Sequence, residues 1–123
     1  MSSFLSISPD KLARLIGIPA SPVIIDVRTD EDFAADPHLI PSAIRRSHAG
    51  VAQWASEFRE RSAIVVCQRG HKLSQGVAAW LRVEGSAAET LEGGFEAWKQ
   101  ARLPSVPVAR LPASDFKGRT VWV

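Results

Sequence analysis

The sequence of 123 residues contains a single cysteine and no long apolar run. One cysteine excludes a disulfide within the chain. No apolar run approaches the roughly 18 residues of a membrane span, and residues 1–6 lack the basic segment and long apolar core of a signal peptide. We therefore expect a protein of the reducing cytoplasm that does not associate with membranes.

The sequence also lacks a block of like charge. Its 15 Lys and Arg residues and 13 Asp and Glu residues are interspersed and give a formal net charge of +2. A balance of this kind does not suggest nucleic-acid binding, so we expect no nucleic-acid partner. Hydrophobic residues make up 46% and charged residues 23%, which is an ordinary balance for one soluble domain with a core.

Segments typical of strands alternate with segments typical of helices. Strands are predicted at 23–25, about 43–46, 63–66 and 86–91. Helices are predicted after the N-caps Ser8 and Thr29, over 49–61, from the end of the loop at 67–72 to about Glu84, and from Phe95. Helical spacing also predicts that Trp54 and Trp80 pack in the core. This alternation predicts an α/β fold with a mainly parallel sheet and helices on both faces.

The only cysteine, Cys67, stands where a predicted buried strand meets a compact polar loop. The loop that follows contains Gln68, Arg69, Gly70, His71 and Lys72. A loop that turns from a strand into a helix directs backbone N–H groups inward, ahead of the positive end of the helix dipole. Such a loop attracts anions and favours the thiolate form of Cys67.

Two interpretations of Cys67 are open. A lone cysteine is more often a small buried hydrophobic residue than a nucleophile. However, ligands of α/β sheets bind at the carboxyl ends of strands, and an inert thiol is not usually followed by several cationic side chains. Position therefore favours a nucleophile.

Four motifs in this order resemble the rhodanese-like domain family. They are Asp26-Val27-Arg28, Ile40-Pro41-Ser42-Ala43, Cys67-Gln68-x-Gly70-x-Lys72 and Leu91-Glu92-Gly93-Gly94-Phe95-x-Ala97-Trp98, which together lie within about residues 8–104. The resemblance implies a rhodanese-like fold with a mainly parallel five-stranded sheet. It also implies that Asp26 and Arg28 hold the loops near the site in place and that Gly93 and Gly94 have a structural role.

The resemblance further implies sulfurtransferase activity without a metal or cofactor. Cys67 would take sulfur from a small anionic donor such as thiosulfate and carry it as a persulfide to cyanide or to a thiol, either small or on a protein. The substrate-binding residues would be Gln68, Arg69, Gly70, His71 and Lys72. Within this set we expect Arg69 and Lys72 to hold the donor, and we interpret His71 as an exposed loop residue.

The sequence departs from the family pattern at three positions. Many single-domain members have arginine where this chain has Lys72, so a point charge replaces a bidentate contact. Ser42 stands where the family commonly has glycine, and one extra residue separates His38 from Ile40. In phosphatases of this fold, five residues separate the catalytic cysteine from an arginine. That position is Leu73, which disfavours phosphatase or arsenate reductase activity.

Composition divides the chain into a domain over 1–104 and an extended arm or linker over 105–123. The sequence pattern of residues 118–123 predicts a strand. This short sequence also resembles the start of the domain that follows a rhodanese-like module in some bacterial chromate-resistance proteins. An alternative function is therefore a non-catalytic module for sensing or partner binding, linked to oxyanion response.

Overall fold

The computed structural model describes residues 5–108, and its centre is a parallel sheet of five strands. The strands are β1 (Ser6–Ile7), β2 (Val23–Asp26), β4 (Ile44–Arg45), β5 (Ser62–Val66) and β6 (Ala87–Leu91). Their spatial order is β1-β6-β5-β2-β4, and every neighbouring pair is parallel. The predicted α/β fold with a parallel sheet is confirmed, and β5, the strand before Cys67, is the middle strand.

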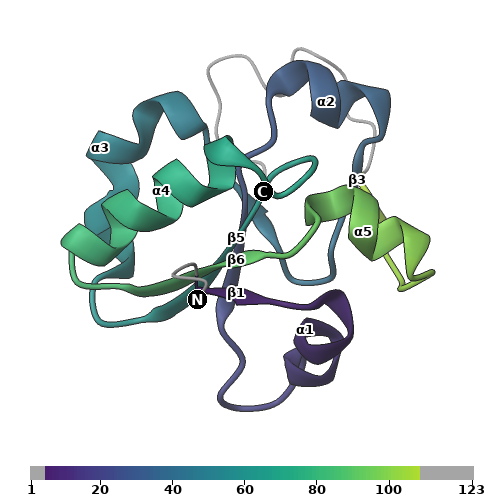
Figure 1. Ribbon diagram of the computed structural model, residues 1–123, viewed down its shortest axis with the longest axis horizontal. Coiled ribbons are helices and arrows are strands. Elements are labelled where there is room, and N and C mark those ends of the chain that lie inside the picture. Colours follow the sequence, from purple (N-terminus) through teal and green to yellow (C-terminus); the bar gives the residue numbers. More distant parts are fainter. Residues whose placement is uncertain (1–4, 109–123) are drawn as a thin grey trace.

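Helices cover both faces of this sheet (Figure 1). Alternate residues of β5 point to opposite faces, so Ala63 and Val65 meet α3 (Val51–Trp54) and α4 (Lys72–Val83). Ile64 and Val66 pack on the other face with α1 (Pro9–Leu15) and α5 (Gly94–Gln100). The sheet is therefore the middle layer of three.

Side-chain caps begin the first two helices where the sequence predicts them. Ser8 accepts from the Lys11 N–H at 3.2 Å at the start of α1. Thr29 accepts from the Asp32 N–H at 3.1 Å at the start of α2 (Asp30–Ala35). Ser42, the residue in place of a glycine, has φ +72°, so the chain keeps a glycine-like turn here without glycine.

Two expectations about helices are wrong. Residues 49–61 do not form one helix but a 3₁₀ turn η1 (His48–Gly50), α3 and a second 3₁₀ turn η2 (Ala55–Phe58). The α-helical segment ends at Trp54, whose φ of −107° is still in the right-handed helical region and whose indole N–H donates to the Ser47 carbonyl at 2.8 Å. Trp54 is buried as predicted, whereas Trp80 is 45% exposed, because Val77 and Leu81 occupy the core-facing side of α4.

The start of the predicted arm lies against the domain. Strand β7 (Val106–Pro107) pairs antiparallel with β3 (His38–Leu39), and the Trp98 indole N–H donates to the Pro104 carbonyl at 2.8 Å. These contacts hold the segment after α5 beside the loop that follows α2. The predicted strand at 118–123 lies outside the described residues.

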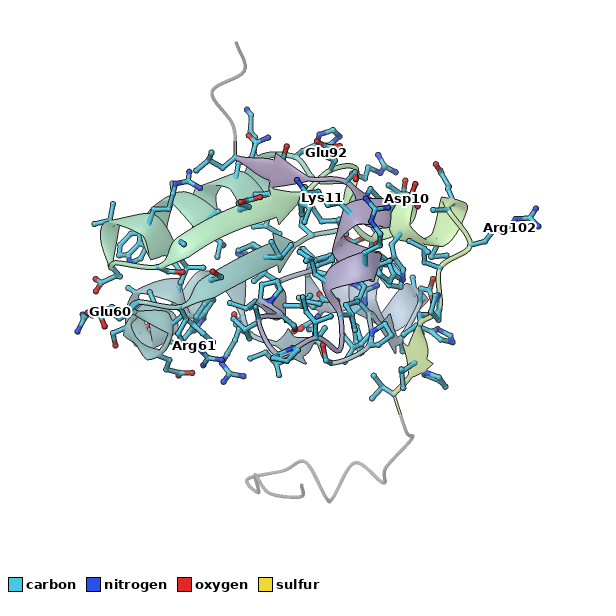
Figure 2. The ribbon with its side chains drawn as sticks, turned by 90° about the horizontal axis from the view of Figure 1, so that it is seen from below. Asp10, Lys11, Glu60, Arg61, Glu92 and Arg102 are labelled. Carbon is cyan, nitrogen blue, oxygen red and sulfur yellow. The ribbon has the colours of Figure 1, made fainter. Side chains whose placement is uncertain are left out.

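Charged side chains of both signs project from the surface at separate parts of the molecule. Figure 2 labels Glu60 and Arg61 at one end and Arg102 at the other, with Asp10 and Lys11 on α1 between them. All five are exposed or partly exposed, so the interspersed charge of the sequence is also dispersed in space. Within residues 5–108, no helix has both the length and the apolar character to span a membrane.

Candidate active site

Cys67 lies at the carboxyl end of the central strand β5, and its side chain is almost covered. The residue is 4% exposed, and its Sγ accepts a hydrogen bond from the Gly70 N–H at 3.2 Å. Helix α4 begins at Lys72, and the N-cap residue His71 makes no side-chain hydrogen bond to its first turn. The sulfur thus lies within a loop whose N–H groups and helix dipole favour negative charge.

The loop from Cys67 to His71 is held by the backbone at the start of α5. The Phe95 and Glu96 N–H groups donate to the carbonyls of Cys67 and Gln68 at 2.9 and 3.0 Å. A Cβ on Gly94 would lie 2.4 Å from the Cys67 oxygen, and one on Gly70 would lie 2.8 Å from the Gly93 nitrogen. Gly70, Gly93 and Gly94 also have positive φ, so the two segments approach as closely as glycine allows.

An open pocket of about 410 Å³ lies over the sulfur. The loop and α4 contribute part of its wall, and α2 and α5 contribute the rest. Its lining residues are Asp32, Cys67, Gln68, Arg69, His71, Leu73 and Glu96. The thiol is therefore within reach of a small ligand, although little of it is exposed.

Arg69 and Gln68 both point at the carboxylate of Glu96. The Arg69 Nε donates to Glu96 Oε2 at 3.3 Å, and the Gln68 Nε2 donates to the same oxygen at 3.4 Å. Hydrogen bonds from Gln68 and then Arg69 hold the pKa of Glu96 below its ordinary value. Glu96 is thus ionised at neutral pH and partly compensates the Arg69 charge, while Asp32 adds a second carboxylate to the pocket.

The structure separates the two remaining basic residues of the loop. His71 is exposed, as interpreted from the sequence, and it also lines the pocket. Lys72 is exposed as well, but it is not among the pocket-lining residues. His71 can therefore contact a ligand directly, whereas Lys72 acts on the pocket through its charge at longer range.

Asp26 and Arg28 form a buried ion pair beneath the neighbouring loops. The Arg28 guanidinium donates to Asp26 Oδ2 at 2.9 Å and to the carbonyls of Asp36 and His38 at 3.1 and 2.6 Å. The guanidinium carbon Cζ also lies 4.0 Å from the centre of the Phe95 ring, at the end of α5 that bonds to the Cys67 loop. Neither residue lines the pocket, which matches a structural role.

Three residues that the sequence analysis did not single out lie at the site. Ser74, fully buried in the first turn of α4, has its Oγ 3.2 Å from Cys67 Sγ. Asp32 and Glu96 reach the pocket from α2 and α5. No local pattern places any of the three at the site, because Ser74 and Asp32 stand in the first turn of a helix as many polar residues do. Among residues 5–108, no group of three or more His, Cys, Asp or Glu side chains could hold a metal ion.

Comparison with known proteins agrees with this geometry. Residues 8–101 match the family model described as the rhodanese-like domain. The chain is 33% identical over 100 residues to the thiosulfate sulfurtransferase GlpE of Stutzerimonas stutzeri, a match that covers 80% of this chain and 88% of that protein.

Solved structures give the same result. A rhodanese-like domain protein from Staphylococcus aureus is 30% identical with a TM-score of 0.67, and the match covers 77% of this chain and 91% of that one. A rhodanese-related protein from Thermoplasma volcanium shares the fold at 23% identity and a TM-score of 0.71, over 84% of this chain and 98% of its own. This chain belongs to the rhodanese-like domain family.

Proposed function

We propose that this protein is a sulfurtransferase that moves sulfane sulfur from a donor such as thiosulfate to a thiol or to cyanide through a persulfide on Cys67. The observation that carries the proposal is the position of Sγ, which accepts the Gly70 N–H at the base of an open pocket. The relative named as a thiosulfate sulfurtransferase supports the choice of donor.

The reaction has two displacements on sulfur. The Cys67 thiolate attacks the outer sulfur of thiosulfate, the S–S bond of the donor breaks, and sulfite departs with the electron pair. An acceptor thiolate or cyanide then attacks the outer sulfur of the persulfide and returns Cys67 as thiolate. The Gly70 N–H stabilises the thiolate before the first step and the negative charge that returns to Sγ in the second, while Arg69 and His71 face the donor from the pocket wall.

Mass spectrometry of the protein after thiosulfate treatment tests this proposal. We expect one added sulfur atom, removed by cyanide with formation of thiocyanate. Release of one sulfite for each loaded sulfur would identify the first displacement. Absence of any adduct, under conditions that load another rhodanese, would refute the use of thiosulfate.

The Glu96→Gln variant should bind thiosulfate more tightly than the wild type. The substitution would remove a negative charge from the pocket and release Arg69 from its ion pair at 3.3 Å, so that the guanidinium can meet the donor. Since an exposed ion pair is a weak interaction, we expect KM for thiosulfate to fall by no more than about fivefold. Steady-state kinetics at fixed ionic strength measures the change.

A matched control is Glu84→Gln, which removes a comparable ion pair with Arg59 outside the pocket lining. Its KM should equal that of the wild type. A KM that rises in Glu96→Gln would mean that the carboxylate orients Arg69 for the donor rather than competing with it.

The wild-type protein should not hydrolyse p-nitrophenyl phosphate. Leu73 lines the pocket at the position where phosphatases of this fold carry arginine, and an isobutyl group cannot hold the oxygens of a phosphoryl group. The Leu73→Arg variant should also have little activity, because a phosphoryl group needs several loop N–H groups around its oxygens in addition to one guanidinium. Release of p-nitrophenol is the measurement, and turnover by the wild type that is lost in Cys67→Ser would favour a phosphatase.

A further inference from the structure

Ser74 is a buried polar residue in direct contact with the reacting sulfur. It has no solvent exposure, and its Oγ lies 3.2 Å from Cys67 Sγ and 3.3 Å from the His71 carbonyl oxygen. Ser74 does not line the pocket, whereas Cys67 does. Its hydroxyl can therefore act on the inner sulfur but cannot touch the donor or the acceptor.

The hydroxyl has one hydrogen and two acceptors within reach. When Cys67 is a thiol, the S–H donates to Ser74 Oγ and the hydroxyl donates to the His71 carbonyl. When Cys67 is a thiolate, the S–H is gone and the hydroxyl can turn to donate to Sγ. The His71 carbonyl then keeps its bond from the Gln75 N–H at 3.2 Å, so this rotation leaves no buried acceptor without a partner.

We propose that Ser74 is a catalytic residue that promotes discharge of the persulfide, an inference that rests on the proposed sulfurtransferase function. In discharge, the acceptor attacks the outer sulfur, the bond between the two sulfurs breaks, and the electron pair goes to Cys67 Sγ. As this charge develops, the Gly70 N–H donates to Sγ and the Ser74 hydroxyl, whose Oγ lies 3.2 Å away, turns to donate to it as well. No other atom changes its oxidation state in this step beyond the two sulfurs and the attacking atom.

The loading step should respond differently to loss of this hydrogen bond. A thiolate without the Ser74 hydrogen bond is more basic, and a more basic thiolate is a poorer leaving group but a stronger nucleophile. Ser74→Ala should therefore slow discharge about tenfold, since hydrogen bonds to charged groups are among the strong ones, and should slow loading far less.

The test measures discharge separately from loading. Wild type and Ser74→Ala are converted to the Cys67 persulfide with inorganic polysulfide, which modifies an accessible thiolate whether or not thiosulfate is a substrate. Thiocyanate formation is then followed in single turnover with excess cyanide, and thiosulfate loading is measured in a second experiment. If thiosulfate does not load the wild type, the proposed donor is wrong, while the discharge experiment still decides the role of Ser74.

Two further variants separate chemistry from packing. Ser86→Ala removes another buried hydroxyl, which donates to the Arg61 carbonyl at 2.9 Å away from the pocket, and it should leave discharge unchanged. Ser74→Thr keeps the hydroxyl and should discharge within about threefold of wild type. Equal rates of discharge in wild type and Ser74→Ala, or an equal slowing of loading and discharge, would overturn the proposal.

Discussion

Replacement of Cys67 by serine is expected to abolish sulfur loading and transfer while leaving the fold intact. The chain has one cysteine, so no other thiol can take the sulfur. A serine hydroxyl is a much weaker nucleophile toward sulfur than a thiolate. The two hydrogen-bond partners of Sγ, the Ser74 hydroxyl and the Gly70 N–H, are not bases that could activate a serine at position 67. We expect transfer to fall to the detection limit, rather than to a reduced rate.

Serine should be accepted at this position because its surroundings are polar. The Gly70 N–H and the Ser74 hydroxyl, which now contact the sulfur, can both bond to a serine Oγ. The unfolding temperature should therefore stay within a few degrees of the wild type. Mass spectrometry after thiosulfate treatment, together with thermal unfolding, checks both halves of this prediction. A residual adduct on the folded variant would contradict the assignment of Cys67.

Local features of the sequence predict four of the five strands of the central sheet, but not the two-residue strand β1. The apolar segment at 63–66 predicts β5, and the N-caps Ser8 and Thr29 begin helices because their side chains bond to N–H groups three residues ahead. Such interactions lie within one turn or one strand, so they are encoded by neighbouring residues. The parallel sheet follows in turn, because strands separated by helices join in parallel.

The electrostatics of the pocket could not be predicted in the same way. From the sequence, Arg69 is an unopposed cation of the loop, but in the structure it pairs with Glu96, which lies 27 residues further along the chain. Asp32 reaches the same pocket from α2. These contacts depend on how α2 and α5 are placed at the carboxyl edge of the sheet. A local sequence pattern does not predict that placement.

The error at Trp80 and the omission of Ser74 both concern the way in which α4 packs on the sheet. Spacing of three or four residues shows that residues share a helix face, but it does not show how far that face extends at its edge, where Trp80 lies 45% exposed. Ser74 is a polar residue on the buried face of α4, and it is recognisable as part of the site only from the 3.2 Å contact with Cys67 Sγ. Buried polar groups of this kind need three-dimensional structure to be understood.

The Gly94→Ala variant is expected to lose both stability and sulfur loading. Its Cβ would lie 2.4 Å from the Cys67 carbonyl oxygen and 2.6 Å from the Gly70 nitrogen, distances at which the backbone has to move. Positive φ at Gly94 adds conformational strain. Strain and overpacking of this kind each cost about 1–3 kcal/mol, so we expect the free energy of unfolding to fall by about 2–6 kcal/mol.

Two other glycines separate the causes of this loss. Gly17 has φ +91° but nothing within 4 Å of its Cβ position, so Gly17→Ala should show the cost of positive φ alone, about 1–2 kcal/mol. Gly76, within α4, has neither constraint, and Gly76→Ala should be neutral or stabilising by up to about 1 kcal/mol. Denaturant unfolding measures all three variants.

Sulfur loading distinguishes Gly94 from both controls. Movement of the Cys67 carbonyl away from a new methyl group would displace the loop, and with it the Gly70 N–H that donates to Sγ. Loading by thiosulfate should therefore be lost in Gly94→Ala under conditions where the variant is still folded, and kept in Gly17→Ala and Gly76→Ala. A Gly94→Ala protein that is no less stable than Gly17→Ala and loads normally would show that the loop does not depend on the close approach of α5.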